Sequence, residues 1–288
     1  MLARSAVCPR SEYVLGLGPH GFHRLHYTEW GDPANPRVLV CVHGLTRNGR
    51  DFDALAQALQ GDYRIVCPDL PGRGASDWLP ESADYGYSLY LNDMAVLLAR
   101  LQVEQIDWLG TSLGGLLGML LAAQPRTPIR CLLLNDAGPF VPQAALARIA
   151  AYVGGDPRFK DLQGAEDYLR EVHAPFGNLT DAQWRHLAVI STRLLPSGEY
   201  RLHYDPALGT AFREKASEPM DLWPIWEAIR CPVKVLHGET SDLLLTDTLE
   251  GMKTRGPAAQ VIELPGCGHA PALMAQEQIE AVRELLLR

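Results

Sequence analysis

A serine lies at the centre of the glycine-rich hexapeptide G-T-S-L-G-G, Gly110–Gly115. A strand-like apolar run precedes it, and a small, apolar segment typical of a helix follows it. In this context a nucleophile elbow presents a serine hydroxyl at the tip of a sharp turn. The glycines let strand and helix approach closely, and the helix N-terminus directs backbone N–H groups toward negative charge. We interpret Ser112 as a nucleophile; the alternative is a glycine-rich turn with an incidental serine.

A serine hydroxyl is a weak nucleophile until a neighbouring base accepts its proton. Among nine histidines, His269 stands out because it lies in G-C-G-H-A-P, Gly266–Pro271, between the last predicted strand and the last predicted helix. Flanking glycines on a strand-end loop give this side chain reach, whereas a core histidine would lie on an apolar face. We predict that His269 is the base for Ser112.

The third member of such a site is a carboxylate that orients the histidine. The segment H-G-E-T-S-D, His237–Asp242, follows a predicted strand and places Asp242 in the next loop. The resulting chain order of serine, aspartate and histidine is known for one class of serine hydrolases. We prefer Asp242 as the acid.

Two other carboxylates compete with Asp242. Asp136 lies in L-N-D-A-G-P, directly after another predicted strand, and we interpret it as a residue that forms a strand-end turn. Glu239 lies closer to its own strand and is a weaker candidate. All three acids remain open on sequence alone.

A second strand-end segment, C-V-H-G-L-T, Cys41–Thr46, offers backbone donors. We expect the Leu45 N–H and the Leu113 N–H, which follows the serine, to form an oxyanion hole. Removing one such donor typically lowers the rate by about 10²–10³-fold. His43 and His237, each in a His-Gly step, are interpreted as structural turn formers.

The elements that must position these residues alternate between buried strands and amphipathic helices. Such alternation is typical of a parallel sheet covered on both faces, a doubly wound α/β fold. The segment Phe22–Trp30 has a different pattern and predicts an antiparallel edge hairpin. The predicted strands are Val38–Val42, Tyr63–Cys67, Gln105–Leu109, Arg130–Leu134, Val233–His237 and Gln260–Leu264.

One region interrupts the alternation. Residues 138–228 contain no convincing buried strand and hold amphipathic or mixed segments instead. We predict a core formed by residues 1–137 and 229–288 and a helical insertion over the sheet, residues 138–228. The amphipathic or mixed segments are Gln143–Val153, Ala165–Val172, Asp181–Leu194 and Asp205–Ala216.

Length, charge and cysteine content narrow the class of protein. The 288 residues carry a net charge of −8 and contain 47% apolar residues. An acidic chain without a basic block argues against nucleic-acid binding, and no apolar run approaches the roughly 20 residues that span a bilayer. Six cysteines without metal-ligand spacing predict neither a disulfide scaffold nor a metal site. We expect a reduced, cytoplasmic protein without a cofactor.

The combined motifs resemble those of the α/β-hydrolase superfamily, in its lid-bearing serine-hydrolase branch. The resemblance implies an eight-stranded, mostly parallel sheet, with a helical lid at residues 138–228. It assigns nucleophile, acid and base to Ser112, Asp242 and His269, and the oxyanion donors to Leu45 and Leu113. The matching segments, in family order, are V-H-G-L (Val42–Leu45), D-L-P-G-R-G-A-S (Asp69–Ser76), G-T-S-L-G-G, H-G-E-T-S-D and G-C-G-H-A-P.

The resemblance implies a carboxylic-ester hydrolase that forms an acyl-enzyme on a small-molecule or oligomeric ester. Aromatic and aliphatic residues in the insertion favour an apolar acyl group. A carbon–carbon bond hydrolase or lactonase with the same triad is an alternative. A receptor that binds a small molecule without turnover is an alternative of another class. The sequence predicts neither the ester nor the oligomeric state.

Overall fold

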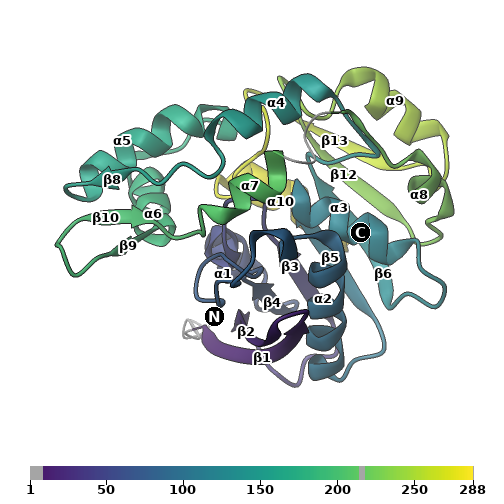
Figure 1. The fold of residues 1–288 in the computed structure, drawn as a ribbon. Coiled ribbons are helices and arrows are strands. Elements are labelled where there is room, and N and C mark those ends of the chain that lie inside the picture. Colours follow the sequence, from purple (N-terminus) through teal and green to yellow (C-terminus); the bar gives the residue numbers. More distant parts are fainter. Residues whose placement is uncertain (1–8, 214–217, 288) are drawn as a thin grey trace, which may run out of the picture.

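An eight-stranded, mostly parallel sheet forms the centre of the protein (Figure 1). The computed structural model describes residues 9–213 and 218–287. The strand order is β1-β2-β4-β3-β5-β6-β12-β13. The strands are β1 (Arg10–Gly18), β2 (Gly21–Trp30), β3 (Val38–Val42), β4 (Arg64–Pro68), β5 (Ile106–Thr111), β6 (Ile129–Asn135), β12 (Val233–Gly238) and β13 (Gln260–Leu264).

The sheet contains both antiparallel and parallel pairs of strands. β1 and β2 form an antiparallel hairpin at the sheet edge, but the segment predicted as the hairpin, Phe22–Trp30, belongs to its second strand alone. β2 also pairs antiparallel with β4. All other neighbours in the sheet are parallel. Parallel neighbours require crossover connections, which the helices of the chain supply. The carboxyl ends of β3, β5, β6 and β12 therefore meet along one edge of the sheet.

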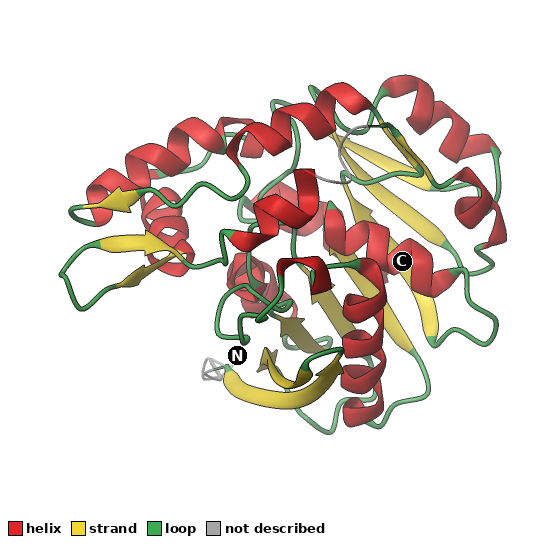
Figure 2. Ribbon diagram, viewed as in Figure 1, coloured by secondary structure: helices red, strands yellow, loops and turns green. Residues whose placement is uncertain are grey.

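Helices cover both faces of the sheet (Figure 2). Side chains alternate between the faces, so that Val38, Val40 and Val42 pack into one core and Leu39 and Cys41 into the other. The first core also contains apolar residues of α2, α3, α8 and α9, and the second contains those of α1 and α10. These helices are α1 (Asp53–Leu59), α2 (Tyr87–Leu101), α3 (Leu113–Ala122), α8 (Trp223–Ala228), α9 (Thr246–Thr254) and α10 (Gln276–Leu287).

Apart from α8, the region between β6 and β12 lies beside and above the sheet edge, mainly teal and green in Figure 1. It is less purely helical than the sequence predicts, because short strands form a three-stranded and a two-stranded sheet. The elements are β7 (Phe140–Val141), α4 (Gln143–Tyr152), β8 (Arg158–Phe159), α5 (Leu162–Val172), η3 (Ala174–Phe176), α6 (Asp181–Ser191), β9 (Thr192–Leu194), β10 (Tyr200–Leu202), α7 (Ala207–Arg213) and β11 (Met220–Asp221).

The six core strands predicted from Val38 onward agree with the structure to within one or two residues. In the insertion the differences are larger: the segment predicted at 181–194 splits into α6 and β9, and the end of the segment predicted at 205–216 lies outside the described residues. Two further 3₁₀ turns are η1 (Gly49–Phe52) and η2 (Ser82–Asp84). Among the helices of the described residues, none is long and apolar enough to cross a bilayer.

Candidate active site

Ser112 occupies the sharp turn between β5 and α3. Its φ of 52° and ψ of −115° lie in a region that non-glycine residues rarely adopt. The turn is close-packed: a Cβ on Gly110 would overlap the Gly114 carbonyl, and one on Gly114 would overlap the Val42 carbonyl. The hexapeptide therefore forms the elbow that its glycines predict, with the serine at its tip.

His269 bridges Ser112 and Asp136. Its Nε2 lies 2.9 Å from Ser112 Oγ, and its Nδ1 lies 2.8 Å from Asp136 Oδ2. An ionised carboxylate only accepts hydrogen bonds, so Nδ1 donates to Asp136 and Nε2 of the neutral ring accepts from the serine hydroxyl. This is the arrangement needed to remove a proton from Ser112.

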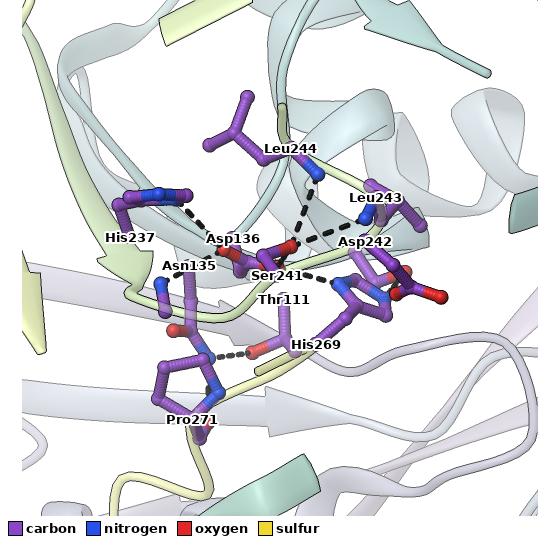
Figure 3. Close-up of polar contacts among 12 residues, drawn as sticks. Thr111, Asn135, Asp136, His237, Ser241, Asp242, Leu243, Leu244, His269 and Pro271 are labelled. Atoms are coloured by element: carbon purple, nitrogen blue, oxygen red, sulfur yellow. Dashed lines mark hydrogen bonds and ion pairs between the residues drawn. The ribbon is translucent and has the colours of Figure 1, made fainter. Parts of the chain in front are cut away.

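Asp136 is buried, yet its environment favours the charged form. Burial alone would raise the pKa of its carboxyl group, but the imidazoles of His237 and His269 and the Ser241 hydroxyl lower that pKa below its usual value. The Gly238 N–H donates to Oδ1 at 2.9 Å, and the Ser241 hydroxyl donates to Oδ2 at 2.5 Å. His237 and His269 lie on opposite sides of Asp136 (Figure 3).

A buried amide ties three strand-end segments together. The Asn135 side chain donates to Thr111 Oγ1 at 3.0 Å and to the Pro271 carbonyl at 2.9 Å (Figure 3). The Ser112 N–H donates to the Asn135 carbonyl at 3.2 Å. The serine, the residue before Asp136 and the histidine loop are thus held in one hydrogen-bond network.

Asp242, the acid preferred from sequence, does not contact His269. Its carboxylate accepts from Arg148 of α4 at 2.5 and 2.9 Å, and half of its side chain is exposed. Ser241, the residue before it, contacts Asp136 instead. The expected position of the acid is therefore corrected to Asp136, at the end of the adjacent strand β6.

The third candidate acid has a structural role. Glu239 accepts a hydrogen bond from the Gly266 N–H at 2.9 Å and so supports the histidine loop. Distance from the strand end separates Asp136 from Asp242 but not from Glu239: Asp136 and Glu239 directly follow β6 and β12, whereas Asp242 comes four residues after Gly238, where β12 ends. Sequence reasoning also gave no role to Asn135 or Ser241.

The two expected oxyanion donors lie beside Ser112. Leu45, Leu113 and Ser112 line the same cavity. Within the described ranges, neither the Leu45 N–H nor the Leu113 N–H donates to a protein group. Both amides are therefore available to a bound oxygen atom.

His43 holds the turn that ends in Leu45. It is buried, and burial lowers the pKa of its imidazole to about 4, so the ring is neutral at ordinary pH. Its Nδ1 donates to the Gly44 carbonyl at 2.7 Å, and its Nε2 accepts from the Leu70 N–H at 2.9 Å. The predicted structural role of His43 is confirmed, whereas His237 lies against Asp136, a contact that sequence reasoning missed.

A cavity of about 110 Å³ opens beside the serine. Its walls come from the core and the insertion, and almost all of its side chains are apolar or aromatic. Ser112, the candidate nucleophile, is the hydroxyl-bearing aliphatic residue that lines the cavity. The lining residues from the core include Leu45, Tyr85, Tyr87, Tyr90, Leu113, Leu116, Ala137 and Leu243; those from the insertion are Val141, Leu146, Ile149, Leu208, Ala211, Phe212 and Met220.

No metal-ligand cluster is found within residues 9–213 and 218–287: no three histidine, cysteine, aspartate or glutamate side chains gather as an ion would require.

The chain matches the model of a family described as "Alpha/beta hydrolase family" over residues 39–282. A relative from Cupriavidus necator, named 3-hydroxybutyrate-oligomer hydrolase, is 49% identical over 279 residues, covering 94% of this chain and 95% of that protein.

Two solved structures share the whole fold. A putative hydrolase from Rickettsia typhi has a TM-score of 0.91 and 33% identity, covering 98% of this chain and 99% of its own. An alpha/beta hydrolase from Novosphingobium aromaticivorans has a TM-score of 0.85 and 38% identity, covering 97% and 98%.

The hydrogen bond from Ser112 to His269 predicts a reactive serine. A fluorophosphonate probe should label Ser112, because its hydroxyl contacts an imidazole oriented by a buried carboxylate and also lines the cavity beside Leu45 and Leu113. Ser11 contacts His26, which pairs with the buried Asp69, but Ser11 does not line this cavity and should remain unlabelled. Mass spectrometry of the digested adduct identifies the site. Ser112→Ala should remain unlabelled and melt within a few degrees of the wild type; an adduct on another serine would contradict the assignment.

Proposed function

The chain is a hydrolase of the alpha/beta hydrolase family, and from this premise we propose that it cleaves carboxylic esters through an acyl-enzyme on Ser112. The observation that supports the proposal best is the position of His269, whose two ring nitrogens contact Ser112 and Asp136 at 2.9 and 2.8 Å. This geometry suits attack on an acyl carbon.

In the first half of the proposed reaction, Ser112 Oγ attacks the ester carbonyl carbon and His269 Nε2 accepts the hydroxyl proton. Negative charge that develops on the carbonyl oxygen is stabilised by the Leu45 and Leu113 N–H groups. Asp136, already ionised, stabilises the imidazolium. His269 then donates the proton to the alkoxide as the carbon–oxygen bond breaks, and the alcohol leaves.

In the second half, a water molecule attacks the acyl-enzyme. His269 Nε2 accepts a proton from this water, and the new tetrahedral species uses the same two N–H groups. Collapse breaks the bond to Ser112 Oγ, which regains its proton from His269 and releases the carboxylic acid. Protein groups alone move the protons in this scheme.

The cavity supports a short, apolar acyl unit as the preferred substrate group. A cavity of about 150 Å³ lined by aliphatic side chains holds a benzene molecule, so about 110 Å³ suits a group of a few carbons. The relative that shares 49% identity is named for oligomers of 3-hydroxybutyrate, which are short esters. We propose short hydroxyacid oligomers as the substrate class and the insertion, residues 138–228, as the lid that shapes the acyl site.

The proposal is tested by turnover of p-nitrophenyl butyrate and of the linear dimer of 3-hydroxybutyrate. Both should be hydrolysed, and Ser112→Ala should reduce both rates by a factor of about 10⁴ or more, since the nucleophile is lost. Cleavage of a lactone or a carbon–carbon bond substrate without ester turnover would support the alternative enzymes. Binding of the dimer without turnover would support a receptor.

The acid is tested by Asp136→Asn and its matched control Asp242→Asn. Asp136→Asn should lower kcat by about 10³-fold or more near neutral pH, because the amide removes the charge that fixes the imidazole tautomer. Asp242→Asn should lower kcat by about tenfold or less, because it disrupts only a half-exposed ion pair with Arg148. Steady-state kinetics measure both, and circular dichroism checks folding. A crippled Asp242→Asn beside an active Asp136→Asn would reverse the assignment.

The acyl site is tested by Leu146→Ala, which enlarges the cavity from the insertion side. The ratio of kcat/KM for p-nitrophenyl octanoate over the butyrate should rise about tenfold, since each methylene that gains room contributes about 1 kcal/mol or more. Leu194→Ala is the control, because Leu194 belongs to the same insertion but is 61% exposed. Equal ratios in the two variants would mean that the acyl group binds elsewhere.

A further inference from the structure

The motif D-L-P-G-R-G-A-S, Asp69–Ser76, takes no part in the reaction described above, yet it contains a completely buried arginine. Arg73 has 0% exposure and forms no ion pair with any carboxylate of the described residues. A buried cation without an acidic partner is unfavourable unless other groups compensate for its lost hydration. The groups that contact the Arg73 guanidinium must therefore replace the water it has lost, and they show what the charge can act on.

The Arg73 guanidinium is held by oxygen atoms and aromatic rings. Its Nε donates to the Leu45 carbonyl at 2.8 Å, and its Nη1 donates to the Pro71 carbonyl at 2.7 Å and to the Tyr90 hydroxyl at 2.8 Å. The rings of Tyr90 and Tyr85 lie 5.1 and 5.9 Å from its central carbon. Its Nη2 is buried without a hydrogen-bond partner.

The first of these contacts connects Arg73 to the reaction. Leu45 lies beyond the end of β3, so no strand pairing fixes its peptide groups. Its N–H is one of the two proposed oxyanion donors, and its C=O is the group that Arg73 holds. Because only φ and ψ of this residue separate the two groups, fixing the carbonyl limits the directions in which the N–H points.

The same short segment is fixed from its other end by His43. The His43 imidazole accepts a hydrogen bond from the Leu70 N–H, and Leu70 belongs to the same motif as Arg73. The motif thus binds both sides of the turn 43–45, through Leu70 and through Arg73. An oxyanion hole depends on donors held in place before the charge develops.

We propose that Arg73 is a positioning residue for the oxyanion hole, acting through the Leu45 carbonyl; the inference rests on the proposed function. Its fixed positive charge, buried beside the hole, also favours negative charge on the substrate oxygen. The contribution is made in the transition state, so kcat depends on Arg73 more than KM does.

The test compares Arg73→Met and Arg73→Lys with the wild type. Arg73→Met leaves no unpaired carboxylate behind, because Arg73 has no acidic partner, so the variant is expected to fold. Its kcat for p-nitrophenyl butyrate should fall about 10–100-fold, below the 10²–10³-fold loss typical of deleting a donor outright, with KM within about threefold. Arg73→Lys keeps the positive charge but not the planar guanidinium, so its kcat should lie between those of the wild type and Arg73→Met.

Two inhibitors separate positioning from a general loss of structure. A butyryl trifluoromethyl ketone forms an oxyanion adduct with the serine, whereas the matching methyl ketone binds chiefly as a neutral ground-state analogue. In Arg73→Met, affinity for the first should fall by the same factor as kcat/KM, and affinity for the second should change less than about threefold.

Arg64→Met is a control for the loss of an arginine bonded to a main-chain carbonyl. Arg64 donates to the Leu101 carbonyl and, unlike Arg73, also pairs with Glu29 at 2.9 Å, so circular dichroism checks that the variant folds. It lies at the opposite end of β4 from the motif. Its kcat should remain within about twofold of the wild type.

The inference is overturned if Arg73→Met keeps kcat within threefold of the wild type, or if both ketones lose affinity equally. Where Arg73→Met does not fold, Arg73→Lys decides by the same two ketones: a selective loss supports the inference, and unchanged kcat and affinities overturn it. Failure of the proposed function is seen separately, because the wild type and Ser112→Ala would then hydrolyse the ester at equal rates. The inference would fail with it.

Discussion

The two hydrogen bonds of His269 join parts of the chain that lie far apart in sequence. Its partners Asp136 and Ser112 are 133 and 157 residues away. Such contacts require the carboxyl ends of β5 and β6 to be neighbours and the loop after β13 to reach across the edge that they form. The parallel pairing of β5 with β6 and of β6 with β12 provides this arrangement. The Asn135 amide then links the three segments directly.

The ionised state of Asp136 depends on its surroundings rather than on solvent. Full burial opposes a charge, so the carboxylate requires donors around it. The Gly238 N–H, the Ser241 hydroxyl and His269 donate to it. The imidazoles of His237 and His269 and the Ser241 hydroxyl lower the pKa of the carboxyl group below its usual value. Because the acid lies between β6 and β12, the folding of the sheet also forms the electrostatic environment of the base. Asp242, half-exposed and paired with Arg148, has no such environment.

Local sequence patterns predicted most of the core and two members of the proposed triad. A continuous apolar run identified β3, a shorter apolar pattern identified β13, both with their ends correct, and the glycines around Ser112 identified the elbow, because these signals are local. The acid was assigned to Asp242 instead of Asp136 because both residues follow strands. The side chain that faces His269 is determined by contacts between two strands, β6 and β12, and local sequence does not show these contacts. The short strands of the insertion and the contacts of Arg73 also depend on distant residues, so no local pattern indicated them.

The central claim is that Asp136 holds the Nδ1 proton of His269. Proton NMR tests it directly, because an imidazole N–H bonded to a buried carboxylate gives a far-downfield resonance that is protected from exchange with water. The account predicts that one such resonance is present in the wild type and Asp242→Asn and absent from Asp136→Asn and His269→Gln. His23 and His26 also contact buried carboxylates, Asp93 and Asp69, and their resonances should be present in all four proteins. A resonance that survives Asp136→Asn and disappears in Asp242→Asn would contradict the account.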